Sequence, residues 1–151
     1  MSGRAKTLIA AGLLALVGTW PLVHRVLTSR YDLNPWEFFG WAMYATPRPT
    51  VVVSVLAPRG GKWQEIPQGV FPPPLAEIKV GYEIRRRQIG KFQTPDPLAA
   101  AVFVQWPSLE RVAIRSRRFV LDRRSGIFEP RDDWYLCGAA ERCKPTAEPL
   151  R

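Results

Sequence analysis

The longest apolar stretch of the chain lies close to its N-terminal end. No residue from 7 to 23 carries a charge, and the stretch extends to Leu27 if the polar ends of His24 and Arg25 reach a membrane interface. About 21 helical residues span about 31 Å, which matches a bilayer core of about 30 Å. The pattern therefore predicts a helix long enough to cross a membrane.

A transmembrane signal anchor over residues 7–27, after a cytoplasmic tail at residues 1–6, accounts for this stretch best. A cleaved signal peptide and a buried helix of a soluble domain are the alternatives. Residues 15–20 contain no A-x-A cleavage site, which disfavours cleavage. The stretch also lacks the polar face of a helix that packs on a soluble domain.

The charges that flank the predicted anchor set its expected orientation. The α-amine, Arg4 and Lys6 precede the anchor, whereas Arg25 and Arg30 follow its apolar part. Positive charges in short flanks favour the cytoplasmic side, so the N-terminus is expected inside by a narrow margin. We therefore predict a single-pass membrane protein whose C-terminal domain is periplasmic or extracellular.

A cluster of aromatic residues follows the anchor. Asn34, Pro35 and Glu37 are typical of a helix start, and they predict a membrane-proximal helix over residues 34–45. Trp and Tyr favour the headgroup level, and exposed aromatic clusters mark binding surfaces, so contact with lipid or with another membrane protein is expected; packing in the domain core is the alternative. The residues expected to make these contacts are Trp36, Phe38, Phe39, Trp41, Met43 and Tyr44.

Residues 49–148 have the pattern of a small folded domain. A β-branched run over residues 50–56 predicts a buried strand. A Pro/Gly turn at residues 58–61 and an alternating segment over residues 62–66 predict that the chain returns as a hairpin.

The middle of the domain has a helical pattern. The prolines of residues 68–74 predict an extended connector. Residues 75–92 show both helical spacing and a strictly alternating section, and their length together with the stop signal at Gly90 favours a helix over a strand. A second helix is predicted where Thr94 or Asp96 can cap, and Pro95 or Pro97 can start, the strongly apolar run over residues 98–104.

A second hairpin is predicted after these helices. Residues 110–122 form the first strand and residues 123–126 the turn, and the return strand starts at Ile127 with a break at Pro130. The prolines after Lys144 predict a frayed tail. The order of elements predicts an α+β fold, with one N-terminal transmembrane helix followed by a small domain of two β-hairpins and one or two helices.

The charge balance is strongly basic. The 151 residues include 22 Lys and Arg against 13 Asp and Glu, a formal net charge of +9. Attraction to anionic lipid headgroups suits a tethered domain, whereas nucleic acid is an unlikely partner outside the cytoplasm; a merely solvated surface is the third interpretation. The expected basic surface consists of Arg85, Arg86, Arg87, Arg115, Arg117, Arg118, Arg123 and Arg124.

The two cysteines, Cys137 and Cys143, are close enough in sequence to form a small disulfide. A structural disulfide suits an oxidising compartment, and unpaired thiols or a redox-active pair are the alternatives, although the spacing is not C-x-x-C. One His and two Cys are too few for most metal sites, so neither a metal nor a cofactor is expected.

No catalytic motif stands out in the sequence. The adjacent acids Asp132 and Asp133 are expected to face solvent in a loop rather than act as an acid/base pair. The leading hypothesis is an accessory or scaffolding component of a membrane complex, with membrane lipid and a membrane protein as partners. The alternatives are an envelope enzyme or thiol-redox protein that uses Cys137 and Cys143, and a cytosol-facing nucleic-acid binder; enzymatic activity is the less favoured class.

Overall fold

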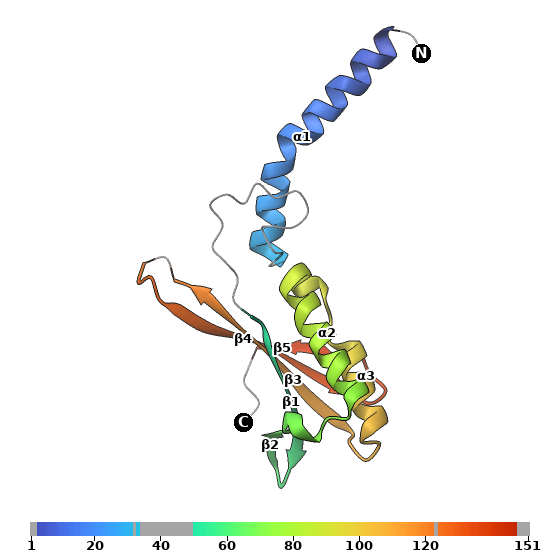
Figure 1. Cartoon of the computed structure of the whole chain (residues 1–151), viewed down its shortest axis with the longest axis vertical. Coiled ribbons are helices and arrows are strands. Elements are labelled where there is room, and N and C mark those ends of the chain that lie inside the picture. The colour runs from blue at the N-terminus through green and yellow to red at the C-terminus, as the bar shows by residue number, and fades with distance from the viewer. Residues whose placement is uncertain (1–2, 32, 34–49, 123, 148–151) are drawn as a thin grey trace.

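The protein consists of a long apolar helix and a small α+β domain, described by a computed structural model for residues 3–31, 33, 50–122 and 124–147. The helix α1 (Gly3–Tyr31) rises away from the domain (Figure 1). The α+β class is as predicted. The elements of the domain are β1 (Val52–Arg59), β2 (Lys62–Glu65), η1 (Gln68–Val70), α2 (Pro73–Ile89), η2 (Gly90–Phe92), α3 (Asp96–Gln105), β3 (Arg111–Leu121), β4 (Phe128–Gly138) and β5 (Lys144–Thr146).

The strands form one antiparallel sheet in the order β2-β1-β3-β4-β5. The two predicted hairpins, β1–β2 and β3–β4, are both present and are joined side by side through β1 and β3. Gly60 and Gly61 form the two-residue turn of the first hairpin, with φ of 56° and 77°, values that a residue without a Cβ adopts at little cost. The helices α2 and α3 cover one face of the sheet (Figure 1).

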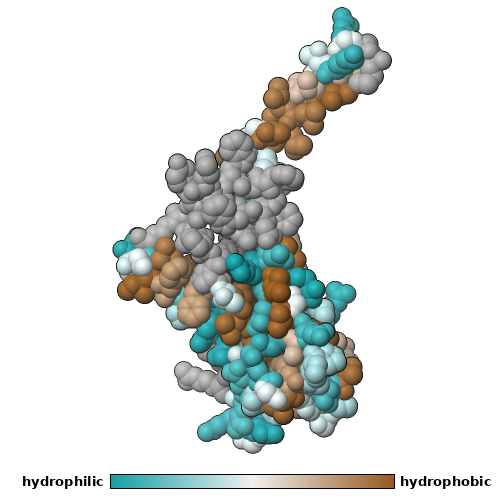
Figure 2. Space-filling model, in the orientation of Figure 1, coloured by the Kyte–Doolittle hydropathy of each residue, from teal (hydrophilic) through white to brown (hydrophobic). Residues whose placement is uncertain are grey.

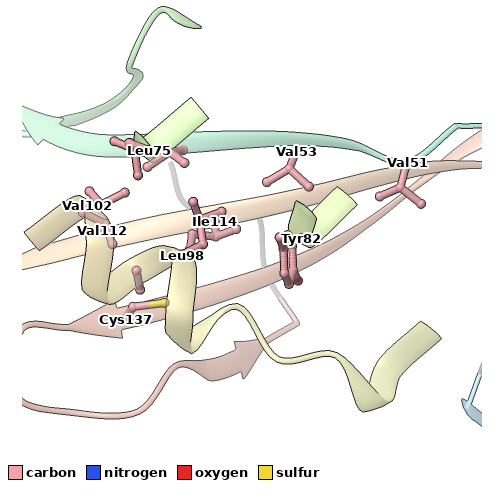
Figure 3. Packing of buried hydrophobic residues seen from close by; sticks show 11 residues of the cluster. Val51, Val53, Leu75, Tyr82, Leu98, Val102, Val112, Ile114 and Cys137 are labelled. Carbon is pink, nitrogen blue, oxygen red and sulfur yellow. The ribbon is translucent and has the colours of Figure 1, made fainter. Parts of the chain in front are cut away.

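The hydrophobic core lies between that face and the two helices. Figure 3 shows side chains of β1 and β3 packed against side chains of α2 and α3. The buried residues of α2 recur at helical spacing, which confirms the helix that the sequence favoured over a strand for this segment. The core residues are Val51, Val53, Val55, Leu75, Tyr82, Leu98, Ala99, Val102, Val112, Ile114 and Cys137.

The break predicted at Pro130 is wrong, because β4 continues through it opposite Phe119. The N–H of Asp122 donates to the carbonyl of Ile127, and the N–H of Ala139 donates to the carbonyl of Glu110. Hydrogen-bonded pairs alternate along an antiparallel ladder, so the pair of Phe119 and Pro130 falls at a non-hydrogen-bonded position. The proline nitrogen therefore faces away from β3, and no ladder bond is lost.

Two other predictions fail for reasons of packing. The connector over residues 68–74 is not extended throughout: η1 forms within it, and Pro73 begins α2, where a missing N–H costs nothing. The tail predicted to fray over residues 144–151 instead begins with β5, which pairs with residues 134–136 of β4, and residues 148–151 lie outside the described residues.

The helix α1 extends beyond the predicted anchor at both ends, and its apolar window is long enough to span a membrane. Its large apolar residues are mostly exposed, with Leu14 at 74%. His24, expected to be exposed at the membrane edge, is buried, and its ring lies 6.1 Å from that of Trp20. The predicted helix over residues 34–45 lies outside the described residues, and so do its six expected contact residues. Arg123 of the expected basic surface also lies outside them.

Candidate functional site

The junction between α1 and the domain is an aromatic contact. The ring of Tyr31, the last residue of α1, stacks on the ring of Phe92 in η2, with centroids 4.5 Å apart and planes 20° apart. The C-terminal end of α2 therefore lies next to the end of the apolar helix, as Figure 1 shows. The exposed cations Arg85, Arg87 and Lys91 belong to this end of the domain.

Arg86 is buried beneath this end of the domain, with 4% of its surface exposed, so it is not part of an exposed basic surface. Its guanidinium donates to Asp133 Oδ2 at 2.8 Å and to the carbonyl of Gly90 at 2.7 Å, and more distantly to that of Gln93 at 3.3 Å. The guanidinium also lies 5.7 Å from the ring centroid of Tyr135. A planar fork with several donors can satisfy acceptors in different directions, which accounts for an arginine at this buried position.

A second buried charge on α2, Lys79, lies near β1 rather than β4. Lys79 donates to Glu83 Oε1 at 2.6 Å, and the same oxygen accepts the backbone N–H of Val53 at 2.9 Å. Val53 lies in β1 beyond the part that β2 covers, so this carboxylate satisfies a donor on a strand edge that β2 leaves open. Glu83 and Arg86, one turn of α2, thus connect the helix to β1 and to β4.

Between these two charged contacts lies Tyr82. Its hydroxyl is 3.4 Å from Ser116 Oγ, and burial raises the pKa of Tyr82 to about 12. Burial also raises the pKa of Tyr135. Both phenols therefore remain neutral at physiological pH, and the polar groups under α2 form a structural network with internally balanced charge.

The opposite face of the sheet carries a separate set of charges. Arg117 donates to both carboxylate oxygens of Asp132, at 2.9 and 2.8 Å, from the neighbouring strand. This two-bond contact lowers the pKa of Asp132 and raises that of Arg117. Asp132 and Asp133 point to opposite faces of β4, so they do not form a carboxylate pair, and each lies in a strand rather than in the solvated loop that was expected.

Arg115 lies on the same face as Arg117. It donates to Ser54 Oγ at 3.0 Å and to Glu65 at 3.3 Å, and its guanidinium lies 5.5 Å from the ring centroid of Trp134. These contacts join β1, β2, β3 and β4 across the face that the helices leave open. Arg115 therefore has acidic and aromatic neighbours of its own within the sheet.

The structure separates the eight predicted basic residues into different environments. Arg115, Arg117 and Arg118 are half-buried in β3 beside carboxylates, and Arg118 lies 3.8 Å from Asp133. Arg124 is exposed at the tip of the β3–β4 hairpin. Within this set, the exposed basic charge therefore lies at the end of α2 and at the hairpin tip. The other four described arginines of the set lie beside carboxylates of the fold.

Cys137 and Cys143 are joined by a disulfide between the end of β4 and the start of β5. Cys137 is fully buried in the core, and the backbone N–H of Cys143 donates to Asp96 Oδ1 at 2.8 Å. Burial of Asp96 opposes ionisation, but hydrogen bonds from Thr94 and from this N–H outweigh it and lower the pKa of Asp96. The disulfide therefore joins the start of β5 to β4, and the hydrogen bond to Asp96 joins it to α3.

The described residues also line an open pocket of about 510 Å³ at the end of the domain farthest from α1. It lies between the β1–β2 hairpin, η1 and the connection from α3 to β3. Glu65 is its carboxylate, and that group already accepts a hydrogen bond from Arg115. Among the described residues, no three His, Cys, Asp or Glu side chains come together as metal ligands.

The sequence analysis missed Lys79 and Glu83, and it expected Asp132 and Asp133 to face solvent rather than to pair with arginines. One signal was present: Leu75, Tyr82 and Arg86 continue one helical stripe, which places a charge on the buried face and requires an acidic partner. Comparisons of the chain with family models, with curated proteins and with solved structures find no match.

Proposed function

We propose that this protein is a single-pass membrane protein whose α+β domain is held at the outer surface of the bilayer, where it acts as an accessory or scaffolding component of a membrane-protein complex. The observation that carries the proposal is α1, a long apolar helix whose large apolar side chains are mostly exposed. An uncovered apolar surface of this length needs lipid or another protein around it.

The charge distribution of the domain supports a position at the bilayer. The exposed cations Arg85, Arg87 and Lys91 lie at the end of α2 that contacts α1 through Phe92. Basic residues close to a membrane surface are attracted by anionic headgroups. The charged side chains on both faces of the sheet bind one another and stabilise the domain.

The test of the accessory role is purification of the tagged full-length protein from native membranes in mild detergent, followed by mass spectrometry. A stoichiometric membrane protein is expected to co-purify. The triple variant W36A/F39A/W41A should release it while the domain keeps its thermal unfolding transition. The control variant V70A/V104A changes two exposed apolar residues of the domain and should retain the partner.

Two results would contradict this function. A protein that purifies alone from its native membrane is not an accessory component, and a partner that remains bound to the triple variant does not use the aromatic segment. The side of the membrane is tested by labelling Lys62→Cys with an impermeant maleimide in intact cells. Lack of labelling would place the domain in the cytosol and favour nucleic-acid binding.

A further inference from the structure

The β3–β4 hairpin extends well beyond the two helices, and exposed apolar side chains lie on its strands next to the polar turn at its end. Figure 1 shows the hairpin projecting to the side of the domain, and Figure 2 shows hydrophobic surface at its end. The exposed side chains there are Ile127, Phe128 and Phe119, which retain 64%, 47% and 38% of their accessible surface. Large apolar side chains at the end of a projecting hairpin are placed to contact a surface outside the domain.

The backbone at this tip is satisfied by its own turn. The carboxylate of Asp122 accepts the N–H groups of Arg124 and Ser125, at 3.0 and 3.2 Å. The N–H of Gly126 donates to the carbonyl of Asp122, and that of Ile127 donates to Ser125 Oγ. Four successive backbone donors therefore have acceptors within the turn, which lowers the penalty for removing them from water.

The position of the tip relates it to the predicted membrane surface. In Figure 1 the tip reaches the level of the domain end of α1, while it projects to the side of the view away from α2. Arg124 is exposed within the turn, and Arg131 is exposed on β4 a few residues after Phe128. These two cations outnumber the exposed carboxylate of Glu129, which lies between Phe128 and Arg131. Apolar side chains flanked by arginines are complementary to an interface of acyl chains and anionic headgroups.

We infer that the β3–β4 hairpin tip is a second membrane contact, in which Ile127 and Phe128 enter the interface of an anionic bilayer and Arg124 and Arg131 bind its headgroups. This inference rests on the proposed membrane anchoring by α1. The contact is shallow, because Asp122 stays ionised beside it: the hydrogen bond from the N–H of Arg124 lowers the pKa of that carboxyl. Two separate contacts would fix the orientation of the domain relative to the bilayer.

The test uses the full-length protein with its disulfide intact, carrying one additional cysteine labelled with an environment-sensitive fluorophore. The protein is reconstituted in vesicles of phosphatidylcholine and phosphatidylglycerol that contain nitroxide lipids. The test position is Ile127→Cys, and Lys62→Cys at the opposite end of the domain is the matched control. Arg30→Cys reports the interface next to α1, and Leu14→Cys reports the bilayer interior.

We expect a headgroup nitroxide to quench the label at position 127 by a fraction close to that at position 30, with little quenching at position 62. The fraction at position 127 should fall in vesicles of phosphatidylcholine alone. Equal, low quenching at positions 127 and 62 while position 14 is quenched by an acyl-chain nitroxide overturns the hairpin contact and leaves the anchor intact. Absence of quenching at both positions 14 and 127 overturns both proposals. A label at position 127 that is shielded in native membranes but not quenched in vesicles identifies a protein contact instead.

Discussion

Arg86 Nη2 lies 2.8 Å from Asp133 Oδ2, which joins a buried guanidinium of α2 to a carboxylate of β4 that lies 47 residues later in the chain. The same guanidinium holds the carbonyl of Gly90 at the end of α2. One side chain thus fixes the end of the helix and also its position on the sheet. Phe92 in the next turn contacts Tyr31, so this ion pair lies close to the place where the domain meets α1.

Arg86→Ala is expected to lower the free energy of unfolding of the domain by about 3 kcal/mol, because it removes the buried ion pair with Asp133 and the hydrogen bond to the carbonyl of Gly90. The control Arg87→Ala removes a neighbouring exposed arginine and should change it by less than about 0.5 kcal/mol. Tryptophan fluorescence during urea unfolding of the detergent-solubilised protein measures both values. Equal effects of the two substitutions would show that the buried contact adds no stability.

The contact of Arg117 with Asp132 predicts a specific acid sensitivity. The pKa of Asp132 is lower in the folded protein, mainly through the hydrogen bond from Arg117, so the unfolded state binds more protons as the pH falls. The stabilisation is fully present above the unfolded pKa of about 4 and is lost as the pH drops through the lower folded pKa. Asp132→Asn should therefore reduce the fall in melting temperature between pH 5 and pH 2, values chosen to bracket about 4. An unchanged pH profile contradicts this assignment.

The two cysteines should respond unequally to substitution. Closing so short a loop contributes about 2 kcal/mol on the chain-entropy estimate, and either Cys→Ser change removes that contribution. Cys137→Ser additionally buries a hydroxyl in the apolar core, whereas Cys143 is half-buried. Cys137→Ser should therefore have the lower unfolding midpoint. A Cys143→Ser protein that folds but loses a thiol-dependent activity would instead favour the redox alternative.

The stacking of Tyr31 on Phe92 predicts a restrained junction between α1 and the domain. Phe92→Ala should remove about 1 kcal/mol of contact and increase the mobility of a spin label placed at Arg30→Cys. Phe92→Tyr keeps the ring and serves as the control. If the alanine variant leaves the spectrum of the label unchanged, other contacts position α1.

Local sequence patterns were sufficient for the elements whose cause is local. The β-branched run of β1, the glycines of its turn and the apolar run of α3 each predict their structure without reference to distant residues. The length and flanks of α1 also predict a helix that is able to span a membrane. The α+β class follows from the order of these elements.

Contacts between distant residues account for the parts that could not be predicted. Lys144–Thr146 has two charged or rigid residues and little strand propensity, and it forms β5 because the disulfide and the Asp96–Cys143 hydrogen bond bring it to β4. The arginine triplet of α2 looks uniform in sequence, but the helical period turns Arg86 inward and leaves Arg85 and Arg87 exposed. Its partner Asp133 is identified only once α2 is packed on β4.

Pro130 has a consequence for solubility. Within the described residues, β5 pairs with β4 only at Trp134–Leu136, so the preceding half of β4 has a free outer edge. An exposed edge of this kind is a template on which another chain can add a strand. Pro130 offers no N–H on that edge, and charged residues stand on both sides of it. The proline therefore opposes intermolecular β-pairing, and it allows a long hairpin to project beyond the two helices without promoting aggregation.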